Sequence, residues 1–160
     1  MRQTRRRFLL IAGGVVGAAA ALPARAQLPP NIEGLRRAAL QEAIQKVTGG
    51  APVQTGRVTL DVPPLVDNGN TVPVSVKVES PMSAADHVKA IHVFTEKNPQ
   101  PNIIKVSLGP RAGRAQIATR ARIADSGTVI AIAQMSDGSF WSDRVNVVVT
   151  LSACLEDGLI

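Results

Sequence analysis

The sequence predicts an all-β domain, a sandwich of about seven strands that follows one short helix. Three observations predict it: valines that alternate with polar residues, turn signals at regular spacing, and a helical repeat before the first strand. The alternation is clearest from Val72 to Val78, where every second residue is valine, as in a strand with one buried face. Pro73 lacks a backbone N–H, so this strand is expected at a sheet edge, or else Pro73 lies at the start of the strand.

The helix is expected to begin after Asn31, whose side chain can cap the first turn, and to end at Gly49-Gly50. Between these positions apolar residues recur at helical spacing and form one stripe, which we expect to pack on the core. The stripe consists of Ile32, Leu35, Ala39, Leu40, Ala43, Ile44 and Val47.

Further strands are expected because apolar runs alternate with turn-forming pairs such as Asn98-Pro99 and Ser126-Gly127. Asp137-Gly138 between two apolar runs is a strong hairpin signal. The run Thr128–Ala133 is apolar almost throughout, which is typical of a central strand with two buried faces. Short strands at this spacing predict an immunoglobulin-like β-sandwich. The further strands are Arg57–Val62, Val88–Thr95, Ile103–Leu108, Arg114–Ile123, Thr128–Met135 and Phe140–Leu151.

The first 26 residues have the pattern of an export signal. A basic stretch precedes the apolar run Phe8–Leu22, and Ala24-Arg25-Ala26 is a small-x-small cleavage pattern. The stretch Thr4–Leu10 is similar to a twin-arginine signal, with Arg5 and Arg6 as the paired arginines. Cleavage after Ala26 would leave residues 27–160 in a bacterial periplasm. A general secretory signal and an uncleaved membrane anchor are the alternatives.

The charge of the chain does not indicate a nucleic-acid or membrane partner. The chain has 18 basic and 12 acidic residues, but five arginines lie in the first 26 residues, which contain no acid. The rest of the chain therefore carries a charge of about +1, which does not attract nucleic acid or anionic lipid. Aromatic residues make up 2% of the chain, too few for a base-stacking surface. We expect no nucleic-acid binding, and no membrane association after cleavage.

The sequence contains no recognisable catalytic constellation. His87 and His92 are not joined by an acidic or cysteine cluster at metal-ligand spacing, and they would point to opposite faces of a strand. We therefore expect one surface histidine, one packed histidine, no metal and no cofactor. Four arginines form a basic stretch, which is either a solvated face or a surface that attracts an anion or a partner. They are Arg111, Arg114, Arg120 and Arg122.

Cys154 is the one thiol of the chain, and it follows the last expected strand in the C-terminal segment 151–160. Without a second cysteine it cannot form a disulfide within the chain. A thiol in such a terminal segment is a covalent handle, the site of an intermolecular disulfide, or an incidental residue.

Several segments together resemble SoxY, the sulfur-carrier subunit of the periplasmic thiosulfate-oxidising Sox system. The resemblance extends from about Asn31 to Cys154 and implies a carrier rather than an enzyme. Residues 27–150 would form the immunoglobulin-like domain, and residues 151–160 the arm. Cys154 would bind the sulfur intermediate covalently, a SoxZ-like subunit would be the partner, and Sox enzymes would act on the arm. The resemblance is carried by Ile91–Pro99, Leu108–Pro110, Thr119–Ala124, Gln134–Phe140 and the cysteine near the C-terminus.

The residues around Cys154 differ from the family pattern. SoxY arms usually end in Gly-Gly-Cys-Gly-Gly, whereas Ala153 precedes the cysteine here and Leu155-Glu156-Asp157 follows it. The two carboxylates are expected to disfavour the thiolate and to repel an anion such as thiosulfate. Two alternatives therefore stay open: a SoxY-like scaffold or binding module that pairs with a partner but carries no sulfur, and a homodimer joined through Cys154.

Overall fold

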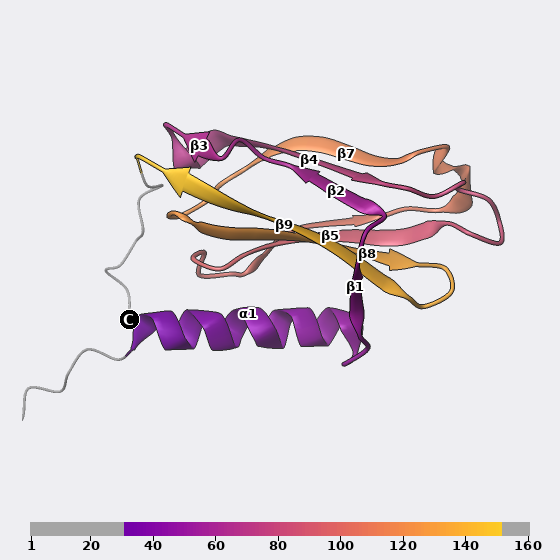
Figure 1. Ribbon diagram of the computed structural model, residues 1–160, viewed down its shortest axis with the longest axis horizontal. Helices are drawn as coiled ribbons and strands as arrows, with labels where there is room; N and C mark the ends of the chain where they lie inside the picture. The colour runs from indigo at the N-terminus through magenta and orange to yellow at the C-terminus, as the bar shows by residue number, and fades with distance from the viewer. Residues whose placement is uncertain (1–30, 152–160) are drawn as a thin grey trace, which may run out of the picture. The chain divides into compact units, whose positions relative to one another are not determined.

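The computed structural model describes residues 31–151, which form a β-sandwich of two sheets with one helix on the outer face of the larger sheet (Figure 1). The larger sheet has the strand order β1-β9-β8-β5-β6, and β3 pairs with β9 outside this path. The smaller sheet has the order β2-β4-β7. Strands β1 and β3 run parallel to β9, whereas the other neighbouring strands are antiparallel.

Within the described residues the chain forms nine strands, the helix α1 (Ile32–Thr48) and two short 3-10 helices, η1 (Gly69–Thr71) and η2 (Pro110–Ala112). The larger sheet contains β1 (Val53–Thr55), β3 (Leu65–Val66), β5 (Val88–Thr95), β6 (Asn102–Ser107), β8 (Gly127–Met135) and β9 (Phe140–Val149). The smaller sheet contains β2 (Val58–Asp61), β4 (Val72–Val78) and β7 (Ala115–Ala121).

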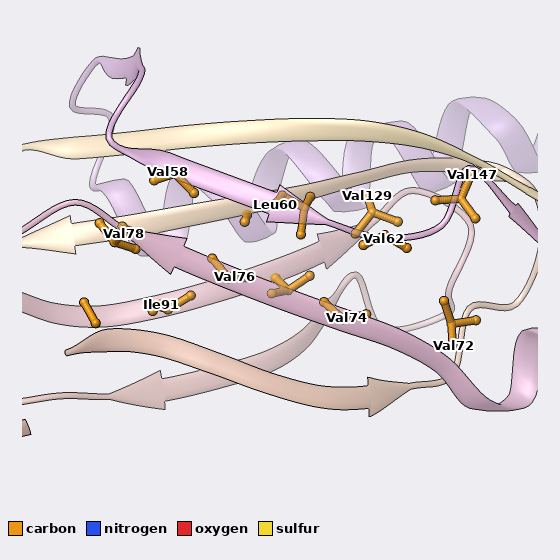
Figure 2. Packing of buried hydrophobic residues seen from close by; sticks show 14 of the residues in the cluster. Val58, Leu60, Val62, Val72, Val74, Val76, Val78, Ile91, Val129 and Val147 are labelled. Carbon is orange, nitrogen blue, oxygen red and sulfur yellow. The ribbon is translucent and has the colours of Figure 1, made fainter.

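The main core lies between the two sheets (Figure 2). The alternating valines of β4 point into it, and all four are buried, as their spacing predicted. They belong to one cluster with Ile91, Val129 and Val147 of the larger sheet. β-Branched side chains suit this position because they lose little conformational freedom on a pleated surface.

A second apolar cluster attaches the helix to the outer face of the larger sheet. Leu40 of α1 packs there with Phe94 of β5, Ile132 of β8 and Phe140 of β9. Strand β8 is therefore buried on both faces, because Val129 and its alternate neighbours face the smaller sheet while Ile132 faces the helix. This confirms the prediction of a central strand.

The helix begins and ends where the sequence predicted. The Asn31 Oδ1 atom accepts a hydrogen bond of 3.0 Å from the Gly34 N–H, and Gly49 ends the helix with a φ of 61°. One part of the prediction is wrong, since Ile32 and Leu35 are 51% and 61% exposed rather than packed on the core. An ion pair of 3.2 Å between Glu33 and Lys97 joins the first turn to the loop that follows β5 instead.

All seven predicted strands are present, with bounds within two residues of those expected. Two strands were not predicted, β1 and β3, because three and two residues are too few to show alternation. The Asp137-Gly138 hairpin is confirmed: Gly138 has a φ of 87°, and the Met135 N–H donates to the Ser139 carbonyl at 2.9 Å.

Of the two alternatives predicted from Pro73, an edge strand or the start of a strand, the structure shows the second. The edge position is wrong, because β4 lies between β2 and β7. The start of the strand is right: Pro73 is its second residue, and β2 pairs with β4 only from Ser75 onward. No β2 residue lies opposite Pro73, so on that side the missing N–H removes no hydrogen bond from the sheet.

The two histidines divide as expected into a surface and a packed residue. His87 precedes β5, and its Nδ1–H donates to the Ser83 carbonyl at 3.1 Å in an exposed position. His92 is 4% exposed, stacks on Phe94, and has the Asn102 side-chain nitrogen 3.3 Å from Nδ1. Burial, and secondarily the charge of Lys105, lowers the pKa of His92.

His92 is therefore expected to make the protein less stable as the pH falls. The unfolded chain takes up this proton near its ordinary pKa of about 6.5, whereas the folded chain resists it until lower pH. Lowering the pH from about 7.5 to about 5.5 should thus reduce the free energy of unfolding more in the wild type than in His92→Gln. Urea unfolding at both pH values measures this, with His87→Gln as the control. An equal loss in wild type and His92→Gln would contradict it.

Candidate functional site

Strand β9 leads the chain toward Cys154, and the described residues end three positions earlier at Leu151. Cys154 and the predicted export residues Arg5, Arg6 and Ala26 lie outside the described residues. The structure therefore defines the base from which the cysteine segment starts, and the site is built from that base.

The segment from Pro64 to Gly69 holds the end of β9 through backbone hydrogen bonds. Val148 N–H donates to the Pro64 carbonyl at 2.8 Å, and Thr150 N–H donates to the Val66 carbonyl at 3.0 Å. The Leu151 carbonyl accepts from the Gly69 N–H at 3.0 Å. The chain is thus fixed up to the last described residue before the cysteine.

Ser126, in the loop that precedes β8, holds the same stretch through its side chain. Its Oγ atom accepts a hydrogen bond of 2.9 Å from the Val149 N–H and donates one of 3.3 Å to the Val149 carbonyl. Both backbone groups of one residue in β9 are therefore satisfied by a single hydroxyl.

Asn98 fixes the loop to which Ser126 belongs. Its amide nitrogen donates to the Arg122 carbonyl at 2.9 Å, and its Oδ1 atom accepts from the Ala124 N–H at 2.8 Å. In the same loop the Ile123 N–H donates to the Gly69 carbonyl at 2.8 Å. Gly69 thereby links the chain after β9 to the chain after β7, because its N–H donates to Leu151 and its carbonyl accepts from Ile123.

Large apolar side chains are exposed around this base. Leu65 is 60% exposed, Val148 is 54% exposed and Leu151 is 63% exposed. Leu65 and Val148 are register partners in the β3–β9 pair. Exposed apolar residues grouped in this way are typical of a surface that contacts another protein.

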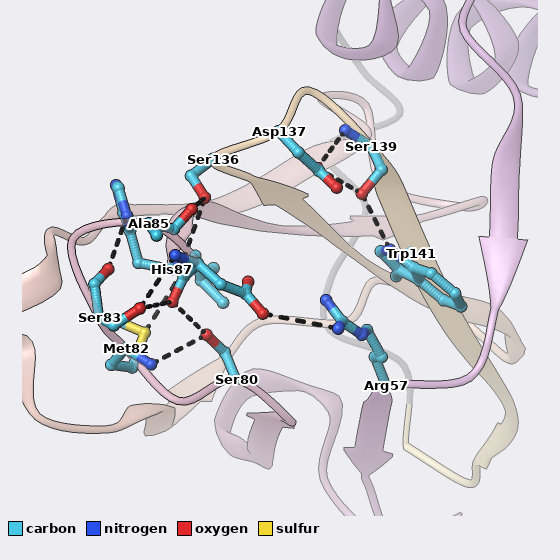
Figure 3. Close-up of polar contacts among 12 residues, drawn as sticks. Arg57, Ser80, Met82, Ser83, Ala85, His87, Ser136, Asp137, Ser139 and Trp141 are labelled. Atoms are coloured by element: carbon cyan, nitrogen blue, oxygen red, sulfur yellow. Dashed lines mark hydrogen bonds and ion pairs between the residues drawn. The ribbon is translucent and has the colours of Figure 1, made fainter.

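A separate polar network orders the opposite end of the sandwich, where β8 turns into β9 (Figure 3). The Ser136 Oγ atom accepts from the His87 N–H and donates to the Ala85 carbonyl, both at 3.1 Å. The Asp137 carboxylate accepts from the Ser139 hydroxyl at 2.7 Å and from its N–H at 2.8 Å, which lowers the pKa of Asp137. These contacts give the Gln134–Phe140 segment a structural role.

The described part of the chain contains no cluster of metal-ligating side chains and no helix suited to crossing a membrane. Between residues 31 and 151 no three His, Cys, Asp or Glu side chains lie close enough together to hold a metal ion. In the same range no helix has the length and apolarity needed to cross a bilayer. The arginines Arg111, Arg114, Arg120 and Arg122 are all exposed.

Ser126 and Asn98 were predicted only as turn residues. Their signal in the sequence is a short polar side chain directly before Gly127 or Pro99, a position where such side chains often bind nearby backbone. Their actual partners are 23 or more residues away along the chain, so the sequence does not reveal them.

The model of the sulfur oxidation protein SoxY family matches residues 44–154, which is more than half of the chain and includes Cys154. The chain belongs to the SoxY family. The SoxY sulfur carrier protein from Chlorobium limicola f thiosulfatophilum is similar in structure, with a TM-score of 0.60 and 25% identity, over 71% of this chain and 98% of that one. No curated protein sequence is significantly similar to the chain.

Other solved structures share the fold of this chain at lower sequence identity. Superoxide reductase (neelaredoxin) from Ignicoccus hospitalis has a TM-score of 0.52 and 17% identity, over 61% of this chain and 94% of that one. Superoxide reductase from Nanoarchaeum equitans has a TM-score of 0.50 and 12% identity, over 60% and 100%. At these identities the likeness concerns the fold alone.

Replacing Ser126 with alanine is expected to loosen the base of the cysteine segment. The variant loses two hydrogen bonds to Val149, and each contributes about 1 kcal/mol. The Val149 amide should therefore exchange its hydrogen faster, which hydrogen–deuterium exchange with residue-level readout measures. Thr128→Ala is the matched control, because the Thr128 hydroxyl donates to the exposed Asn146 side chain at 3.0 Å and not to the Val149 backbone. Unchanged exchange at Val149 in Ser126→Ala would contradict the assignment.

Proposed function

We propose that this SoxY-family protein is a periplasmic sulfur carrier that binds a thiosulfate-derived intermediate covalently on Cys154. The observation that carries the proposal is the family match over residues 44–154, because it reaches the cysteine itself. In the same proposal a SoxZ-like subunit is the partner, and Sox enzymes act on the cysteine segment. The chain itself then needs no catalytic group.

The fixed base supports the carrier role. Cys154 lies three residues after Leu151, so its reach from the last fixed residue is about 10 Å. A thiol at this distance from a rigid domain can be presented to an enzyme without disturbing the sandwich. The exposed Leu65, Val148 and Leu151 would then provide apolar contact area beside it for the partner.

The partner enzymes supply the electron acceptor that the reaction at Cys154 requires. The thiolate forms an S–S bond with the outer sulfur of thiosulfate, and two electrons pass to an electron acceptor in the coupling enzyme. Water then cleaves the bond between the outer sulfur and the sulfonate, which leaves a cysteine persulfide and hydrogen sulfate. Each step needs only one reactive atom from this chain, the Cys154 sulfur.

A second candidate function is a scaffold that pairs with a SoxZ-like subunit and carries no sulfur. The observation that favours it is the sequence Leu155-Glu156-Asp157, which places a bulky group and two carboxylates beside the thiol. In this case the exposed apolar residues at the base would serve the partner contact alone.

Intact-mass analysis distinguishes the two functions. The protein is isolated from cells that oxidise thiosulfate, as wild type and as Cys154→Ser, together with the proteins that copurify. A reductant-sensitive mass increase in the wild type alone is expected for the carrier. An unmodified thiol while the pathway runs would contradict the carrier. A SoxZ-like subunit that copurifies equally with both forms would then identify the scaffold.

Export to the periplasm rests on the first 26 residues. Replacing Arg5 and Arg6 together with lysine keeps the charge but removes the paired arginines, so the uncleaved protein should accumulate in the cytoplasm. Cell fractionation and the mass of the N-terminus measure this, with Arg2→Lys as the control. Normal cleavage after Ala26 in the paired variant would point to a general secretory signal instead.

A further inference from the structure

The two sheets end on the same side of the sandwich in edge strands, β6 in the larger sheet and β7 in the smaller, which have no further neighbour among the described residues. A groove lies between these edges. Its main cavity, of about 700 Å³, is lined by Ile103–Val106 from β6 and by Gln116–Arg120 from β7. An adjoining cavity of about 480 Å³ shares Ile103, Ile104 and Arg120 with it and continues to Asn98 and Arg122.

The groove combines an apolar floor with a basic rim. Ile103, Ile104 and Ile117 are partly buried against the core and form the floor. The charged residues that line the two cavities are Lys105, Arg120 and Arg122, and none of the described lining residues is acidic. Between residues 31 and 151 no carboxylate forms an ion pair with any of the three.

The chemistry of this groove fits an extended segment with apolar and acidic side chains. Edge strands present backbone N–H and carbonyl groups that an added strand can bind. The apolar floor would receive aliphatic side chains, while the arginines and the lysine would attract carboxylates.

The C-terminal segment of the chain itself has this composition. Residues 152–160 contain the acidic pair Glu156-Asp157 between the apolar residues Leu155 and Leu159-Ile160.

The segment also starts beside the groove. Leu151 and Ile123 both bind Gly69, and Ile123 directly follows Arg122, which lines the groove. Nine residues in extended conformation span roughly 30 Å, which exceeds the roughly 23 Å of a seven-residue strand such as β7. The segment is therefore long enough to run along the whole groove.

We propose that residues 152–160 dock into the groove between β6 and β7, with Glu156 and Asp157 beside Arg120 and Lys105. Docking would shield the Cys154 thiol in the isolated protein, and a partner that displaces the segment would expose it. The pairing would also neutralise the two carboxylates next to the thiol. Docking itself needs no sulfur compound. Only its role in shielding the thiol rests on the proposed function.

The rate at which a neutral maleimide modifies Cys154 tests the docking. Each rate is divided by that of a free peptide of residues 150–160 with the same tail sequence, so that direct effects of charge on the thiol cancel. The wild-type ratio should be well below one at low salt and should rise toward one at high salt. Arg120→Glu/Arg122→Glu should raise the ratio several-fold at low salt. Glu156→Lys/Asp157→Lys should do the same.

Combining the two pairs of reversals restores opposite charges, so it should lower the ratio again. Lys89→Glu/Arg144→Glu is the matched control, since these exposed residues do not line the groove, and it should behave as wild type. A wild-type ratio near one would overturn the docking. So would an unchanged ratio in Arg120→Glu/Arg122→Glu, a failed restoration, or protection that depends on protein concentration and therefore arises between two copies. Failure here would leave the sulfur adduct on Cys154 unaffected, so the two proposals are tested separately.

Discussion

Burial of the larger sheet on both of its faces is the constraint on which the rest of the structure depends. The smaller sheet covers one face through the valines of β4, and α1 covers the other through Leu40. Burial of apolar surface is the dominant favourable contribution to folding, so the sheet requires both covers. The smaller sheet ends at β7 and the larger at β6, and no strand between residues 31 and 151 joins them. The sandwich is therefore open between β6 and β7, and the groove lies in this opening.

Strand β9 links this core to the candidate site. It pairs with β8 along most of its length, and it also receives β1 near its beginning and β3 at its end. Beyond the last pair, backbone bonds to Val66 and Gly69 hold the chain as far as Leu151. Most of these contacts use main-chain atoms, so the position of the base depends little on which side chains stand there.

Local signals in the sequence predicted most of the fold. The alternating valines of β4, the Asn31 cap and the Asp137-Gly138 turn each act within a few residues, and each is present in the structure. The predictions that were wrong involve the neighbours of an element. Pro73 is tolerated in a central strand because β2 is shorter than β4 and does not reach it. Ile32 is exposed because the apolar cluster beneath the helix includes no residue of the first turn.

The candidate site was predictable only in part. Cys154 is evident from the sequence because it is the one thiol and follows the last strand. The residues that hold its base are not, because Ser126 and Gly69 reach β9 across long stretches of chain. The basic stretch around Arg120 was visible, but its position beside an open groove depends on which strands end the two sheets.

The late position of β9 affects the order in which the protein can fold. Strands β1 and β3 pair with β9, which is synthesised long after them, so these native contacts join residues far apart in the sequence. Folds with such distant contacts form slowly, and here the larger sheet stays incomplete until Val149 has left the ribosome. A chain cut short within β9 would lack the pairing of its end with β3 and the closure at Gly69.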